Sequence, residues 1–489
     1  MPGPVPTLAR VFGPVAPALA LGVLALALLF HQEAAAAIHI WNTSTAYGHC
    51  WLVLPLALWL LWERRGEAQA VPLAPQRVLA LLVLPLAAAW LVANLLGIME
   101  GRQLAAIGCV EVLLLCVLGW KLWWALSPAF LYLFFLVPFG AFITPHLQDF
   151  TAGFVAHGLD ALQIPSRVTE YKIEIPEGEF YVAEACAGLR FLIASIAFGV
   201  LYAVTMFVSP WRRVAFIAAS MVIPVIANGF RALGIVLLGH ALGSAQAAET
   251  DHVLYGWIFF SIVILLLALA GMPFRQDPPA PPPPLAHAAA GVRLPALAAA
   301  LSVLVLAAAL PLLAPYMDST ASPMAARSVL IVPHGCVLSD EQSTGPVLTQ
   351  HFRCGETVLT ARLQVLPHRA NPARVVDAAQ VPAATLLLDA DIDAGRLESP
   401  GATPRIWALR RDHQHPRASA ATLFIDGQPG PGGLRDRLQL THDLLTGGGR
   451  PAAALVVAVL AGQGDPELAL KAFLGAQGDV NGRVSRLVQ

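Results

Sequence analysis

The chain has 489 residues, of which 57% are hydrophobic and only 12% are charged, whereas about a quarter of a soluble domain is usually charged. Its formal net charge is −1, from 30 Lys and Arg against 31 Asp and Glu, so it lacks the basic excess that binds a nucleic-acid backbone. Six cysteines without a Cys-x-x-Cys pair or a Cys/His cluster predict no disulfide scaffold, no metal site and no cofactor. Composition therefore excludes an ordinary soluble protein and makes nucleic acid an unexpected partner.

Long apolar runs dominate the first two thirds of the chain. A membrane-spanning helix needs about 20 mainly apolar residues. Nine runs come close to this length, at 13–30, 48–62, 77–97, 104–119, 126–143, 187–208, 213–240, 253–273 and 292–316. We therefore expect an all-α polytopic membrane protein of about nine spans, eight in a core and one extra, in which the second and fourth runs are short.

Basic residues indicate the orientation, because Lys and Arg in short loops favour the cytoplasmic side. They occupy alternate loops, namely Arg10, Arg64/Arg65/Arg77, Lys121, Arg212/Arg213 and Arg275/Arg293. We expect a cytoplasmic N-terminus in the cytoplasmic (inner) membrane. The opposite side then receives a loop at 31–47, the segment 144–186 and everything after Met317.

Four parts follow from this pattern. Residues 1–274 form a membrane core, and 275–291 form a cytoplasmic linker whose prolines cannot continue a helix. Residues 292–316 form the extra span, and 317–489 form an extracytoplasmic α+β domain, where roughly half of all charges fall. In that domain we expect strands at 328–332, 357–366, 385–389 and 421–426, and helices near 435–446 and 452–475.

The segment Gln163–Val182 alternates apolar and polar residues on both sides of a Pro-Glu-Gly turn. Such alternation about a turn is typical of a β-hairpin. The hairpin would lead directly to Cys186.

Three polar motifs stand out against apolar surroundings. They are E-A-C-A-G-L-R at Glu184–Arg190, N-G-F-R at Asn228–Arg231, and D-H-V-L-Y-G-W at Asp251–Trp257. In the expected topology the first and third lie at one membrane face, and Arg231 lies in the outer half of its helix. The three motifs can therefore converge.

Each residue also has a purely structural interpretation. An Arg231 at membrane depth costs several kcal/mol unless it faces a partner or a polar cavity, so it marks a functional site or a structural ion pair. Cys186 lies at a boundary beside Arg190, and a nearby cation favours the thiolate. Cys109 and Cys116 are better read as small buried hydrophobes. Covalent acyl transfer requires a nucleophile, a base and a cation at one place. Here separate helices would supply Cys186, His252 and Arg231 in these roles.

The ordered motifs E-A-C-A-G-L-R, N-G-F-R and His252 followed by Y-G-W-I-F-F resemble those of the exosortase/archaeosortase family over about Phe12 to Gly271. The resemblance implies catalytic roles for Cys186, Arg231 and His252. It also implies a cysteine protease or transpeptidase that cleaves secreted proteins at a C-terminal sorting signal of the Pro-Glu-Pro type. Ala187 departs from the family, which commonly has Ser after the nucleophile.

Four further residues are candidates for supporting or substrate-binding roles. Asp251 could orient His252, and Asn228 could position Arg231 by a side-chain hydrogen bond. Arg190 could bind a substrate carboxylate or stabilise the hairpin, and Glu184 lies beside the nucleophile in the same motif. The expected partners are secreted proteins with a sorting signal, the lipid bilayer and an acceptor that the sequence does not identify.

Two other functions remain open. In a transporter or polysaccharide-assembly protein, Glu184, Arg231 and His252 would line an intramembrane path, although no internal repeat of the transporter type is evident. In a scaffold, the C-terminal domain would bind partners. The presence of genes for proteins with sorting signals would favour the protease.

The C-terminal domain contains Cys336 and Cys354, separated by a turn-rich stretch. Disulfides persist in oxidising compartments, so we predict a structural bond between them and a free Cys186. Two buried free thiols are the alternative, since pairing cannot be derived from sequence.

Overall fold

A computed structural model describes residues 11–169, 171–183, 186–243, 252–277, 283, 291–317, 326–367, 370–385, 392–399, 401–412, 417–425, 428–430, 434–446, 452–462 and 464–488. The chain divides into two compact units. Met1–Leu86 with Gln103–Ala308 form the membrane unit, and Ala87–Arg102 with Ala309–Gln489 form the C-terminal unit. Most of the predicted linker 275–291 lies outside the described residues, which include only 275–277, 283 and 291 of it.

Each predicted apolar run overlaps a helix, although the run 126–143 covers only the second half of its helix and continues into two short 3-10 turns, Tyr132–Leu136 and Ala141–Ile143. These helices are α2 (Ala16–Leu29), α4 (Cys50–Glu63), α6 (Val83–Leu96), α7 (Met99–Leu118), α8 (Trp120–Leu131), α10 (Leu189–Met206), α11 (Pro210–Leu242), α13 (His252–Gly271) and α14 (Arg293–Met317). Among the described residues, six helices could cross a membrane by length and composition, or up to eight if each of two bent pairs forms one span. The chain is therefore a multi-pass membrane protein. With 14 residues, α4 extends only about 21 Å, so its crossing remains a prediction.

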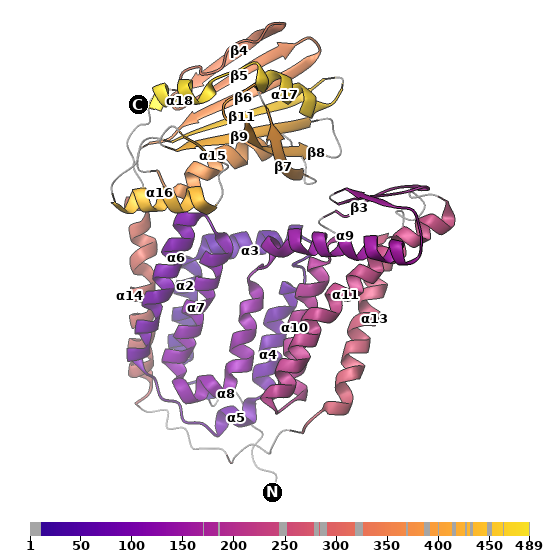
Figure 1. The fold of residues 1–489 in the computed structure, drawn as a ribbon. Helices are drawn as coiled ribbons and strands as arrows, with labels where there is room; N and C mark the ends of the chain where they lie inside the picture. Colours follow the sequence, from indigo (N-terminus) through magenta and orange to yellow (C-terminus); the bar gives the residue numbers. More distant parts are fainter. Residues whose placement is uncertain are drawn as a thin grey trace. The chain divides into compact units, whose positions relative to one another are not determined.

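Two helices occupy segments for which the sequence predicted no helix. The predicted loop 31–47 is largely α3 (His31–Thr43), bent by 78° from α2. The segment 144–186 begins with α9 (Thr144–Ala161), and the pair that contains it is bent by 66°. Both helices lie across one end of the bundle (Figure 1). Their mixed polar and apolar composition is too polar for a span but suits an interfacial helix.

The predicted hairpin is present. Strand β2 (Lys172–Ile175) pairs antiparallel with β3 (Gly178–Tyr181), and Ile175 lies opposite Gly178 across the turn. A further strand, β1 (Arg167–Thr169), extends the sheet beside β2. The apolar face of this sheet packs on α9 and α11 in a cluster of Ala152, Val155, Leu159, Ile173, Ile175, Phe180, Val182 and Val236. Packing on two helices stabilises a hairpin that would be marginal alone.

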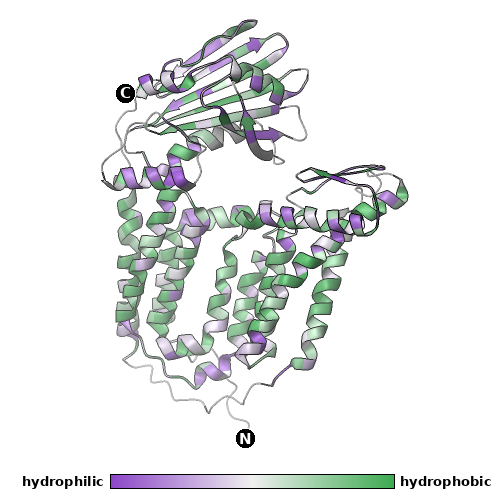
Figure 2. Cartoon of the chain, viewed as in Figure 1, coloured by the Kyte–Doolittle hydropathy of each residue, from purple (hydrophilic) through white to green (hydrophobic). Residues whose placement is uncertain are grey.

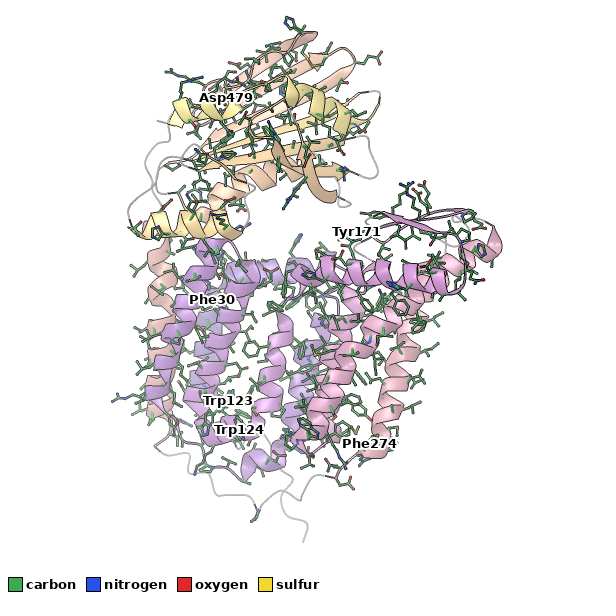
Figure 3. The ribbon with its side chains drawn as sticks, viewed as in Figure 1. Phe30, Trp123, Trp124, Tyr171, Phe274 and Asp479 are labelled. Atoms are coloured by element: carbon green, nitrogen blue, oxygen red, sulfur yellow. A yellow bond between two sulfur atoms is a disulfide. The ribbon has the colours of Figure 1, made fainter. Side chains whose placement is uncertain are left out.

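The two ends of the membrane unit differ in character. At one end, Arg64 Nη2 donates to the Val204 carbonyl (3.5 Å) and Arg212 Nη1 donates to the Phe274 carbonyl (2.8 Å). Figure 3 places Trp123, Trp124 and Phe274 at this end and Tyr171 of the small sheet at the other. Between the ends the helices are mostly hydrophobic (Figure 2). The predicted basic loops thus gather opposite the hairpin, and the cytoplasmic assignment of their end remains a prediction.

The C-terminal unit is built on an eight-stranded antiparallel sheet. Its strands are β4 (Cys336–Thr344), β5 (Val347–Cys354), β6 (Thr357–Val365), β7 (Ile392–Glu398), β8 (Ile406–Asp412), β9 (Arg417–Ile425), β10 (Gln428–Gly430) and β11 (Ala453–Ala461). They follow the order β4-β5-β6-β11-β9-β8-β7, and β10 pairs with β9. Helices α17 (Pro466–Gly475) and α18 (Val480–Val488) pack on one face, and α15 (Pro372–Thr385) packs on the other.

The predicted helix at 452–475 is wrong in its first half, which forms the central strand β11. Leu455 and Val457 face the α17 side while Ala454 and Val456 face the α15 side. A strand covered on both faces reads as a continuous apolar run that periodicity cannot distinguish from a helix.

The remaining elements of this domain were predicted with mixed success. The strands at 357–366 and 421–426 match β6 and the end of β9, and the helix near 435–446 is α16 (Leu434–Thr446). The stretch 328–332 forms no strand. Thr385 ends α15, and the rest of the strand predicted at 385–389 lies outside the described residues.

Cys336 and Cys354 face each other across β4 and β5 and form a disulfide with a Cα–Cα distance of 4.1 Å. The bond ties the start of β4 to the end of β5. Cys50, Cys109, Cys116 and Cys186 are free thiols.

Candidate functional site

Cys186 lies in the short connection between β3 and α10. The connection begins after Tyr181 and ends at Gly188, which precedes α10 with a φ of 87°. The amide of Cys186 donates to the Ala183 carbonyl at 2.8 Å, and the residue is half-buried. Glu184, a predicted supporting residue, lies outside the described residues. The candidate nucleophile therefore lies between the hairpin and the start of α10, at the hairpin end of the bundle.

Asn228 of α11 connects this turn to the candidate cation. Its side chain is 2% exposed, and its Nδ2 donates to the Cys186 carbonyl (2.9 Å) and to Thr151 Oγ1 (3.3 Å). Its Oδ1 accepts from Arg231 Nη1 at 3.3 Å. Since a carbonyl only accepts and a guanidinium only donates, these two partners fix the orientation of the amide.

Arg231 is 1% exposed, one turn after Asn228 on the same helix. Its guanidinium carbon lies 5.4 Å from the ring centroid of Phe191, and that of Arg190 lies 5.0 Å from the same ring. Phe191 in turn stacks on Phe260 of α13, with ring centroids 4.6 Å apart. Both arginines of the sequence motifs therefore approach one aromatic ring, an arrangement that favours cations electrostatically.

The start of α13 closes the other side of this site. A Cβ built on Gly256 would lie 3.2 Å from Nε of Arg231, so the guanidinium rests against the α13 backbone. His252 is the first residue of α13, one helical turn before Gly256. The side chain of His252 and the whole of Asp251 lie outside the described residues. The backbone nevertheless brings the third motif to Arg231.

Two site residues were missed by sequence reasoning, Gln148 and Thr151 of α9. Both are buried, at 5% and 1% exposure. Gln148 Nε2 donates to the Val182 carbonyl at 3.0 Å, and Thr151 accepts from Asn228. Two polar residues spaced i, i+3 on the apolar face of an amphipathic helix were the available signal, but no helix was predicted in the segment 144–161.

Polar contacts of its charged side chains hold the hairpin in place. Lys172 Nζ lies 3.0 Å from Glu174 and 2.8 Å from Glu179, and these bonds raise the pKa of Lys172 while Lys172 lowers that of Glu174. At the turn, Glu177 lies 2.8 Å from Nδ1 of His240, which lowers the pKa of Glu177. Because His240 lies in the last turn of α11, this pair fastens the hairpin to the helix that carries Arg231.

The arrangement therefore offers the half-buried residue Cys186, a buried guanidinium, and one amide bonded to the carbonyl of the first and to the second. By contrast, Cys109 and Cys116 are 1% and 0% exposed inside α7. A thiol and a guanidinium are groups that covalent acyl transfer can use, as nucleophile and as stabiliser of an oxyanion.

Comparisons with known proteins agree with this geometry. Residues 41–269 match the family model described as transmembrane exosortase, a range that includes all three motifs. Neither the curated proteins nor the solved structures give a match. Exosortases are membrane sorting enzymes of a cysteine peptidase/transpeptidase family. The membrane part of this chain belongs to the transmembrane exosortase family.

Proposed function

We propose that the chain is a cysteine protease/transpeptidase that cleaves C-terminal sorting signals of the Pro-Glu-Pro type from secreted proteins, at the outer face of the cytoplasmic membrane. The observation that supports it most is the Asn228 amide, which bonds to the Cys186 carbonyl and to the Arg231 guanidinium. Because Asn228 bonds to both, it fixes the position of the segment that carries Cys186 relative to the Arg231 guanidinium. Such preorganisation is what covalent acyl transfer needs.

Three residues would share the chemistry. The Cys186 thiolate attacks the scissile carbonyl carbon, and Arg231 stabilises the negative charge that develops on the carbonyl oxygen. As the C–N bond breaks, His252 gives a proton to the leaving amine, and a thioester to Cys186 remains. His252 then takes a proton from an incoming amine or water, which attacks the thioester and restores the thiol.

The position of the site suits a substrate that is itself anchored in the bilayer. Cys186 lies between β3 and α10 at the hairpin end of the bundle, and the helices below that end are mostly hydrophobic (Figure 2). A substrate whose membrane helix lies alongside the bundle would place the residues just before that helix at the same depth. The lipid bilayer would then be a partner besides the substrate, because it holds the enzyme's site and the substrate's sorting signal at the same depth.

The direct test is cleavage of a co-expressed, tagged protein that carries such a signal. Cys186→Ala should abolish cleavage while the chain stays inserted in the membrane. Cys109→Ala, a buried thiol inside α7, is the matched control and should cleave normally. Undiminished cleavage by Cys186→Ala would contradict the cysteine mechanism.

The proposed face can be tested separately with a reporter that is active only outside the cytoplasm. Fused after Met317 it should be active, and fused within Pro281–Pro284 it should be inactive. The reverse result would place the Cys186 end on the cytoplasmic side and exclude secreted substrates.

A further inference from the structure

Helix α9 contributes two buried polar side chains to the site, and nothing in the family match assigns a role to either. Its buried face consists of Thr144, Gln148, Thr151, Ala152, Val155 and Leu159. Ala152, Val155 and Leu159 pack beneath the hairpin. Gln148 and Thr151 instead lie under the connection that carries Cys186, where they make hydrogen bonds.

These bonds hold the connection at two points four residues apart. Gln148 Nε2 donates to the carbonyl of Val182 at 3.0 Å. Asn228 Nδ2 donates to the carbonyl of Cys186 at 2.9 Å and has its other acceptor in Thr151, at 3.3 Å. A buried carbonyl or amide that lost its partner would be costly, so each bond constrains where the connection can lie.

Thr151 also affects the cation. An Asn amide has two N–H donors on one side and a carbonyl oxygen on the other. With both N–H groups used by Cys186 and Thr151, Oδ1 is turned toward Arg231 Nη1, 3.3 Å away. Without the Thr151 hydroxyl, one N–H of Asn228 would have no acceptor, and rotation of the Asn228 amide would cost less.

We propose that Gln148 and Thr151 of α9 are positioning residues for the reaction: Gln148 fixes the start of the Cys186 connection, and Thr151 fixes the Asn228 amide that joins Cys186 to Arg231. The inference rests on the proposed function, because positioning matters only if Cys186 and Arg231 react. Neither residue touches the reacting atoms. Both act through the backbone or through Asn228.

The first test measures how accessible Cys186 is on its connection, and it needs no substrate. In a full-length chain with Cys50, Cys109 and Cys116 changed to Ala, Cys186 is the single thiol, because Cys336 and Cys354 form the disulfide. Alkylation of Cys186 by a bulky maleimide should be about threefold faster or more in Thr151→Val and Gln148→Leu, because a released connection exposes the thiol more often. Thr151→Ser, which keeps the hydroxyl, should restore the starting rate.

Gln103→Leu is the matched control. Gln103 is 3% exposed, and its Nε2 donates to the Glu33 carbonyl at 3.1 Å, so this change removes an equivalent buried bond far along the sequence from the site. It should lower thermal stability about as much as Gln148→Leu does and leave the alkylation of Cys186 unchanged. Equal alkylation rates in Gln103→Leu, Gln148→Leu and Thr151→Val would overturn the proposal.

The second test uses cleavage. Thr151→Val and Gln148→Leu should lower kcat by about tenfold or more while KM changes little, because misplacement of reacting groups affects the chemical step. Thr151→Ser should retain most of kcat. Unchanged kcat in both variants would also overturn the proposal. Cleavage by Cys186→Ala would instead contradict the proposed function, and the alkylation result would still decide whether α9 positions the connection.

Discussion

The membrane unit and the C-terminal unit use polar residues in different ways. In the membrane unit, the buried side chains of Thr151, Asn228 and Arg231 form one chain of hydrogen bonds, and Gln148 holds the Val182 carbonyl beside it. In the C-terminal unit the sheet is held by two apolar clusters, one on each face. The ion pairs of Glu467 with Arg411 and Lys471 lie nearer the surface of this unit.

The difference predicts where substitutions will act. Polar groups in an apolar surrounding are costly unless every partner is in place, so a change at the membrane site should affect chemistry strongly. A large sheet spreads its stability over many apolar contacts, so a change in the C-terminal unit should affect stability and spare cleavage. Four predictions test this contrast, from the largest expected effect to the smallest.

Gly188→Ala should have the largest effect. Gly188 has a φ of 87°, and a Cβ there would lie 2.6 Å from Cγ of Asn228. The substitution would displace the amide that joins Cys186 to Arg231, and cleavage should fall about 100-fold or more. The control is Gly243→Ala, which has a φ of 66° and no atom within 4 Å of the added Cβ. Equal cleavage by the two variants would show that backbone strain alone is responsible.

Arg231→Lys should reduce cleavage about 100-fold without lowering the amount of protein in the membrane. Lysine keeps the positive charge but lacks the planar fork that reaches both Asn228 and a developing oxyanion. Arg65→Lys, at the basic end of the bundle, should cleave normally. Loss of the folded protein in Arg231→Lys would instead favour a structural ion pair.

Removal of the disulfide should change stability and leave catalysis intact. The bond closes a loop with a sequence separation of 18, which the chain-entropy model values at about 3 kcal/mol. Replacement of Cys336 and Cys354 by Ser should therefore lower the thermal midpoint of the C-terminal unit, with cleavage within about twofold of normal. Alkylation before and after reduction, with peptide mapping, checks the bond. Severe loss of cleavage would contradict the expectation that changes in the C-terminal unit affect stability and not catalysis.

Glu467→Gln should have the smallest and most pH-dependent effect. Partial burial tends to raise the pKa of Glu467, but hydrogen bonds from Lys471 and Arg411 outweigh it, and the net shift is downward. A lowered folded-state pKa stabilises the fold above the ordinary value of 4.5, and this contribution is lost as the pH falls through the folded-state value. The effect of the variant on hydrogen exchange in α17 should be larger at pH 7 and should shrink as the pH is lowered below 4.5. An effect that does not change with pH would be assigned to packing.

The same contrast explains what the sequence could predict. Arg231 and Asn228 could be singled out from the sequence because polar residues inside an apolar helix are rare. That Cys186 lies near them could also be predicted, because the expected topology brings their motifs to the same end of the bundle. Their catalytic roles remain predictions. Gln148 and Thr151 were missed because they belong to a helix of mixed composition that lies across the bundle end, where neither the pattern of a span nor that of a loop applies.

In the C-terminal unit, local patterns were less informative. β6 alternates buried and partly buried residues over its second half, α16 is an amphipathic helix, and both were predicted. β11 is buried on both faces, and its neighbours β6 and β9 lie far away in sequence. No local signal identifies a strand whose partners are set by such distant pairing.

The central place of β11 also sets an order of events during synthesis. Strands β4 to β6 and strands β7 to β9 each pair along a consecutive run, but only β11 joins the two runs. The nascent chain must therefore reach Ala461, the end of β11, before the sheet can close. Because pairing between distant segments is slow, the membrane helices, with their more local contacts, should already be inserted by then. The two unfinished half-sheets would meanwhile expose open strand edges, which makes this interval the one in which a holding chaperone would matter most.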